Sequence, residues 1–148
     1  MSGQLPLQGL RVLDLASFIA GPVASTVMGD YGAEVIKIEP PGEGDPQRKL
    51  GQAHSIPQHP VNFCWHMTNR NKRSVVLDLK NPLGREAFDR LVATADVMVV
   101  NFPLKVRERL RMRYADVKPA NPRLIYASMT GYGEQGPDAE QPGFDSTA

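Results

Sequence analysis

Short apolar runs rich in β-branched residues recur along the chain, and small, polar or turn-forming residues follow each of them. Runs of this length, bounded by Gly, Pro and Asn, are typical of strands buried in a sheet. The pattern therefore predicts strands at residues 10–15 (LRVLDL), 34–38 (EVIKI), 74–79 (SVVLDL), 97–100 (VMVV) and 123–128 (RLIYAS).

Helical segments separate these runs. Pro22 and Pro82 suit the first turn of helices over residues 22–30 and 82–93, and a short basic helix is predicted near residues 104–112. Strands that alternate with helices form right-handed β-α-β units, which place the strands parallel. We expect an α/β, Rossmann-like, doubly wound and mostly parallel sheet with flanking helices, whose ligands lie outside the carboxyl ends of the strands.

Two segments show no periodic pattern. Residues 40–60 contain PPGEGDP and IPQHP, which predicts a long surface loop of a kind that is often functional. Residues 131–148 are rich in turn-forming residues and have no closing element, so we expect the chain to be part of a larger protein.

Charge and composition narrow the classes of partner. With 17 basic and 16 acidic residues the net charge is +1, so no global field favours nucleic acid or an anionic membrane, and an anion site must be local. A single cysteine, Cys64, excludes an internal disulfide. No run is apolar enough to span a bilayer, and residues 1–8 lack the features of a signal peptide, which favours the cytoplasm.

The end of the first strand is one candidate site. Asp14 is followed by ASFIAGP, where Gly21 lets backbone approach a ligand and the next helix presents free N–H groups to an anion. The alternative is that residues 20–22 only make a tight turn between strand and helix.

A cationic run is a second candidate. Lys72 and Arg73 come immediately before a predicted strand, and Lys37, Arg70 and Lys80 could join them around a polyanion such as a nucleotide phosphate. The alternative is a solvated flank of the strand.

Other chemical motifs are weak. Gly131, Gly133 and Gly136 match G-x-G-x-x-G, but Pro137 follows them, so we predict a loop and not a dinucleotide site. Three scattered histidines lack the spacing of a metal site or a triad. The candidate nucleophiles have no evident partner; they are Cys64, Ser17, Asp14 and Asp145.

Five segments in one order resemble the family III CoA-transferases: LxGLRVLDLASFIAGP, YGAEVIKIEPPGEGDP, NRNKRSVVLDLK, ADVMVVNF and NPRLIYASMTGYGEQGP. The resemblance covers nearly the whole chain. It implies that residues 1–148 are the N-terminal part of a large CoA-binding domain, without its returning chain and smaller domain. It also implies a homodimer of interlocked chains, with no tightly bound cofactor.

The resemblance also implies a CoA site. The loop after the first strand would lie near the thioester and Glu39 with Pro40 beside the adenosine, while Ile19 stands where formyl-CoA transferase has glutamine. The sequence N-F-P-L-K at residues 101–105 departs from the family's N-F-x-P-G. The CoA-binding residues so implied are Phe18, Ile19, Ala20, Pro40, Lys72, Arg73, Leu77, Lys80, Asn101, Phe102 and Arg109.

The implied reaction moves CoA from an acyl-CoA to a carboxylic acid through a covalent aspartyl intermediate. The family's nucleophile follows a G-F-D motif, here residues 143–145, so we expect it beyond Ala148 and not at Asp145. Two alternatives remain. One is an α-methylacyl-CoA racemase, which Phe144 disfavours because that branch has a histidine base there. The other is a nucleotide-binding module without a reaction of its own.

Overall fold

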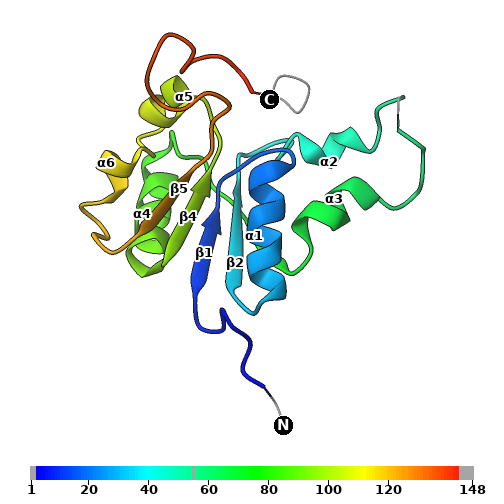
Figure 1. The fold of residues 1–148 in the computed structure, drawn as a ribbon, viewed down its shortest axis with the longest axis horizontal. Coiled ribbons are helices and arrows are strands. Elements are labelled where there is room, and N and C mark those ends of the chain that lie inside the picture. The colour runs from blue at the N-terminus through cyan, green and yellow to red at the C-terminus, as the bar shows by residue number, and fades with distance from the viewer. Residues whose placement is uncertain (1–2, 55, 144–148) are drawn as a thin grey trace.

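A single parallel sheet with helices on both faces makes up the protein in a computed structural model, which describes residues 3–54 and 56–143 (Figure 1). The strand order is β3-β2-β1-β4-β5, and every pairing is parallel. In chain order the elements are β1 (Arg11–Asp14), α1 (Ala20–Asp30), β2 (Glu34–Glu39), α2 (Gln47–Leu50), α3 (Phe63–Asn69), β3 (Lys72–Val76), α4 (Pro82–Thr94), β4 (Val97–Val100), α5 (Leu104–Arg109), α6 (Tyr114–Val117) and β5 (Ile125–Ser128).

The predicted fold class is confirmed, and the strand order has a functional consequence. Leu13 of β1 lies opposite Ile36 of β2 on one side and Met98 of β4 on the other. The chain winds outward from β1 in one direction and then returns to begin β4 on its other side. Loops that follow β1 and β4 therefore leave in opposite directions. The topological switch point between these two strand ends, hereafter the crevice, is where doubly wound folds bind ligands.

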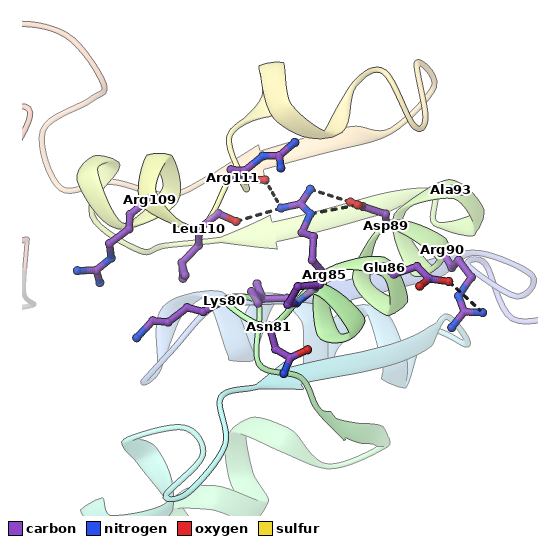
Figure 2. Close-up of a pocket in the computed structure, with 12 residues that line it drawn as sticks. Lys80, Asn81, Arg85, Glu86, Asp89, Arg90, Ala93, Arg109, Leu110 and Arg111 are labelled. Carbon is purple, nitrogen blue, oxygen red and sulfur yellow. Dashed lines mark hydrogen bonds and ion pairs between the residues drawn. The ribbon is translucent and has the colours of Figure 1, made fainter.

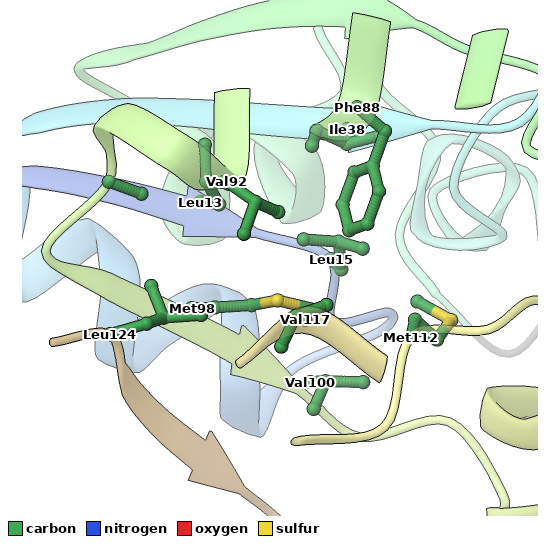
Figure 3. Packing of buried hydrophobic residues seen from close by; sticks show 11 residues of the cluster. Leu13, Leu15, Ile38, Phe88, Val92, Met98, Val100, Met112, Val117 and Leu124 are labelled. Atoms are coloured by element: carbon green, nitrogen blue, oxygen red, sulfur yellow. The ribbon is translucent and has the colours of Figure 1, made fainter. Parts of the chain in front are cut away.

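Apolar side chains cover both faces of the sheet. On one face Phe88 and Val92 of α4 pack on Leu13 and Met98, as Figure 3 shows. On the other face Val12, Val35 and Val97 belong to a second cluster, against which Met28 of α1 packs. Because both faces are covered, all four residues of β4 are buried, as its uninterrupted apolar run predicts.

The long excursion is more regular than predicted. It contains α2, and α3 follows it; α3 begins after Asn62, whose side chain accepts a hydrogen bond from the Trp65 N–H. Thr26 Oγ1 of α1 donates a hydrogen bond of 2.5 Å to the Thr68 carbonyl of α3. Short helices held by contacts of this kind carry little periodic signal, because tertiary packing supplies most of their stability.

The third strand lies two residues earlier than predicted. Lys72 pairs with Val35 and Val76 with Glu39, so β3 runs from Lys72 to Val76 and not over residues 74–79. As an edge strand, β3 takes its limits from its pairing with β2. The hydrophobic pattern misplaced it because Leu77 and Leu79 pack against the core from the loop that follows the strand.

Among the described residues, no helix combines the length and the apolar character that a bilayer span requires.

Candidate functional site

The loop between β1 and α1, residues 15–19, lies at the crevice beside the carboxyl end of β4. Asn101, immediately after β4, holds it with a pair of hydrogen bonds. Its Oδ1 accepts from the Ser17 N–H (2.8 Å) and its Nδ2 donates to the Ser17 carbonyl (2.8 Å). Asn101 was predicted as a CoA ligand, and its side-chain amide is already committed to this loop.

The tip of this loop is strained and apolar. Phe18 has φ of 64°, in the left-handed region that bulky residues rarely adopt. Phe18 and Ile19 remain 46% and 51% exposed, although both are large hydrophobic residues. Strained, exposed apolar residues at a crevice are common where a ligand binds.

Close packing explains why residue 21 is glycine. A Cβ atom at this position would lie 2.2 Å from the Ala16 Cβ, so only glycine lets the first turn of α1 approach the loop so closely. The structure thus gives the tight-turn interpretation of Gly21 a physical basis.

A cluster of four buried charges lies beneath the loop. Lys72 Nζ is 2.7 Å from Asp14 Oδ2, and Lys37 Nζ is 2.8 Å from Asp45 Oδ2. These four side chains are at most 2% exposed. Two ammonium groups and two carboxylates balance each other, as buried charges require. Burial lowers the pKa of Lys72, and the negative charge of Asp14 opposes that effect.

Within the cationic run, Lys72 therefore has a structural role. Lys72 Nζ also donates to the carbonyls of Pro22 and Thr68 and to Asn69 Oδ1 (2.7, 2.9 and 2.9 Å), which leaves it no free proton donor for a phosphate. Arg73 is exposed and pairs with Glu34 at 2.8 Å. Lys72 therefore lacks the geometry of a free phosphate ligand, and the sequence alone could not separate a buried lysine from an exposed one.

Two other predicted cations lie beside the same hollow. Lys80, in the turn before α4, and Arg109, at the end of α5, line one open hollow of about 870 Å³. Neither side chain has a hydrogen bond or ion pair among the residues that the structure describes. Figure 2 shows both side chains extending to the same side of the hollow.

The wall of this hollow is held by Arg85 of α4. Its guanidinium pairs with Asp89 (2.7 Å) and donates to the carbonyls of Leu110 and Arg111 (3.0 and 2.5 Å). These contacts fasten the end of α5 to α4 (Figure 2). The helix that follows Lys80 is thereby joined to the segment that follows Arg109.

The remaining predicted residues lie at carboxyl ends of strands or in the first turn that follows. Ala20 opens α1 and Pro40 follows β2, and both are exposed; Leu77 follows β3 and Phe102 follows β4, and both are partly buried. Asp145 lies outside the described residues. The segment with Gly131, Gly133 and Gly136 forms bends and turns, as predicted, and opens no helix.

Arg107 of α5 escaped the sequence analysis. It is 1% exposed, and its guanidinium donates to Phe102 O (2.5 Å), Ser128 Oγ (2.6 Å), Met129 O (3.0 Å) and Glu134 Oε1 (2.9 Å). These contacts tie the carboxyl ends of β4 and β5 to the glycine-rich loop. No sequence signal distinguishes Arg107 from its basic neighbours.

Glu39, at the end of β2, is a buried carboxylate with strong partners. Burial raises its pKa, but hydrogen bonds from Arg48 (2.6 Å), Ser74 (2.6 Å) and the Asp45 N–H (3.0 Å) outweigh burial and lower the pKa from 4.5 to about 2. A carboxyl group whose pKa is lower in the folded than in the unfolded protein stabilises the fold at any pH above its unfolded-state pKa. That contribution is lost as the pH falls through its folded-state pKa.

We therefore expect Glu39→Gln to destabilise the protein by about 3 kcal/mol at pH 7, the equivalent of the pKa difference. The difference from the unmodified protein should shrink steadily between pH 4.5 and about 2. Urea unfolding across this range measures it, with Glu43→Gln as a control at an exposed carboxylate. A destabilisation that stays constant with pH would contradict the ionic origin.

The strand order, the parallel pairing and the helices on both faces of the sheet define a doubly wound α/β protein. The chain belongs to the CoA-transferase family III, whose model matches residues 7–148.

Known proteins agree with this assignment. The chain is 43% identical over 143 residues to a succinate–glutarate CoA-transferase of Agrobacterium fabrum, and 40% identical over 141 residues to the alpha subunit of a succinyl-CoA–L-malate CoA-transferase of Chloroflexus aurantiacus. Each alignment covers 95% of this chain and 36% and 32% of the relative. A crystal structure of a CAIB/BAIF family protein from Brucella suis superposes with a TM-score of 0.87 at 40% identity, over 98% of this chain and 38% of that one. The chain thus spans about a third of the length of these relatives.

Proposed function

We propose that the whole protein transfers CoA from an acyl-CoA donor to a carboxylic acid acceptor. The observation that carries this proposal is a pair of cations, Lys80 and Arg109, that lie beside one hollow and have no side-chain partner within residues 3–54 and 56–143, in a member of this family. The named activities of the relatives, which include succinyl-CoA and glutarate chemistry, support the same class of substrates.

The charge of CoA suits these two cations. Its phosphates carry several negative charges, which a lysine ammonium meets as a point charge and an arginine guanidinium meets with two parallel hydrogen bonds. We place the phosphates beside Lys80 and Arg109, with Pro40 and Leu77 lining the path of the nucleotide. Lys72 belongs to the buried cluster in this arrangement, and Arg73 stays with Glu34.

The thioester end needs a different surface. Phe18, Ile19 and Ala20 present apolar atoms at the crevice, and Phe102 follows the neighbouring strand. Such a surface excludes water from a reactive acyl group. An apolar Ile19 offers no hydrogen bond to a small polar acyl group, so we propose acyl groups with an apolar portion next to the thioester.

We further propose a covalent route. The carboxylate of an aspartate beyond Ala148 attacks the thioester carbonyl, the carbon–sulfur bond breaks, and CoA leaves as the thiolate. The thiolate attacks the aspartyl carbonyl of the resulting mixed anhydride, which releases the donor acid and leaves CoA on the aspartate as a thioester. The acceptor carboxylate displaces the thiolate from that thioester, and the thiolate then attacks the acyl carbon of the acceptor, which gives the new acyl-CoA and frees the aspartate. We also propose an interlocked homodimer in the cytoplasm, without a tightly bound cofactor.

Trapping the intermediate tests the reaction. We expect full-length protein incubated with an acyl-CoA and then with hydroxylamine or borohydride to show a modified aspartate downstream of Ala148 by peptide mass spectrometry. Succinyl-CoA is a suitable first donor. Parallel assays should detect CoA transfer to dicarboxylic acids.

Other results would redirect the assignment. A modification on Asp145 would move the reacting centre into the present segment. Binding of CoA without transfer to any acid would favour the non-catalytic module. Exchange of the α-proton of a branched acyl-CoA, without transfer, would favour the racemase.

A further inference from the structure

We infer that Lys37 and Asp45 are positioning residues: their side chains hold the main chain of the β1–α1 loop so that Phe18 and Ile19 face the crevice. The inference rests on the proposed function, in which this loop meets the thioester end of the substrate. It assigns a task to two charged residues that the reaction itself does not use.

The contacts fall on consecutive groups of the loop. Lys37 Nζ donates to the Ala16 carbonyl at 2.7 Å, and Asp45 Oδ1 accepts from the Phe18 N–H at 3.2 Å. Asn101 bonds the backbone N–H and the carbonyl of Ser17 between them. Side chains from β2, from the loop after β2 and from the end of β4 thus hold three successive residues of the loop.

Lys37 and Asp45 also hold each other. Lys37 Nζ lies 2.8 Å from Asp45 Oδ2 and 3.8 Å from Asp14 Oδ2. Asp45 Oδ1 accepts a second hydrogen bond, from the Gln47 N–H (2.8 Å), and its own N–H is bonded to Glu39. The carboxylate therefore has a fixed orientation, which fixes where the Phe18 amide must lie.

Fold stability alone does not explain this arrangement. A buried ion pair is often no more stabilising than two apolar side chains of similar size. What an apolar pair could not do is bond to a carbonyl and an amide two residues apart. The left-handed conformation of Phe18 persists only if its surroundings impose it, and these bonds hold its own N–H and the carbonyl two residues before it.

The expected consequence is confined to the acyl end of the site. A loop released from Lys37 and Asp45 samples other conformations, and a misplaced apolar wall slows a reaction more than it weakens distant binding. Lys80 and Arg109 are held through α4 and α5 by Arg85, independently of this loop.

The charge-balanced double variant Lys37→Met/Asp45→Leu of the full-length protein tests the inference. We expect kcat for CoA transfer to fall by about 10-fold or more, with the Kd for CoA changed by less than about 2-fold. Amide hydrogen exchange of a peptide covering residues 15–20 should accelerate by at least about 10-fold. The single variant Asp45→Asn, which keeps an acceptor but loses the ion pair, should show the same changes to a smaller extent.

The matched control is Arg113→Met/Asp116→Leu. It removes two ion pairs of 2.9 Å at the start of α6, Arg113–Asp116 and Arg113–Glu108. Among the described residues, no hydrogen bond or ion pair joins these side chains to residues 15–19, so neither kcat nor the exchange at residues 15–20 should change. Unchanged kcat and unchanged exchange in both the double variant Lys37→Met/Asp45→Leu and the single variant Asp45→Asn would overturn the inference. So would a parallel loss of CoA affinity, kcat and thermal stability, which indicates a general structural role.

Hydrogen exchange separates this inference from the proposed function. If the unmodified full-length protein transfers no CoA, the proposed function fails. Accelerated exchange confined to residues 15–20 would then still establish that Lys37 and Asp45 hold the loop, and unchanged exchange would refute it.

Discussion

Replacing Lys80 and Arg109 together by alanine is expected to weaken CoA binding to the full-length protein by at least about 100-fold. Charge-assisted hydrogen bonds are worth about 1.5–3 kcal/mol each, and both cations lie on the same side of one hollow. Because both side chains lack partners among the described residues, their removal should leave the fold intact. Isothermal titration calorimetry measures the affinity, and the loss should shrink as the salt concentration rises.

A control of equal charge is available in the connection between α6 and β5. Lys118→Ala/Arg123→Ala removes two exposed cations without touching the hollow, and the affinity for CoA should stay within about 2-fold. Equal effects of the two double variants would mean that only net charge matters. Tighter binding of NAD than of CoA would contradict the assignment of the ligand itself.

Replacing Lys72 by methionine is expected to destabilise the protein by about 3–5 kcal/mol, because it leaves a buried charge without its partner. Asp14 is fully buried, and the nearest remaining cation, Lys37, lies 3.8 Å from it and is engaged with Asp45. Three further acceptors, two of them carbonyls, would lose their donor. Urea unfolding of the full-length protein measures the change in free energy.

The adjacent residue provides the comparison. Arg73→Met removes a cation that is 78% exposed and pairs with Glu34 at the surface, so the expected loss is below about 1 kcal/mol. A small loss for Lys72→Met would show that Asp14 is neutralised in another way. It would also restore Lys72 as a candidate phosphate ligand.

Local patterns determined much of the fold. The run at residues 97–100 matches β4 residue for residue, because a strand covered on both faces must be apolar throughout. Asn81 and Pro82 mark the start of α4, where the Asn81 side chain accepts from the Leu83 N–H. Alternation of strands and helices was sufficient for the class of fold, and the five family segments for the class of protein.

Other features arise only when distant segments meet. Along α1 the apolar Val23 and Val27 are exposed, whereas Ser25 and Thr26 are buried. A hydrophobic pattern predicts the opposite, but Ser25 Oγ donates to Asp14 (2.8 Å) and Thr26 bonds α3. The polar side of the helix faces inward because the Asp14 carboxylate and the Thr68 carbonyl, both buried, accept hydrogen bonds from its hydroxyl groups.

The cations show the same division most clearly. The sequence by itself determined that basic residues lie around the third strand and follow the fourth. It could not determine which of them are buried in ion pairs and which are available to a ligand. Tertiary structure decided that Lys72 neutralises Asp14 in the interior, while Lys80 and Arg109 lie beside one hollow with no ion pair in the part of the chain that the structure describes. The physical reason is that a charge is free to bind a ligand only when no opposite charge lies near it, and those distances join residues 58 positions apart in the chain.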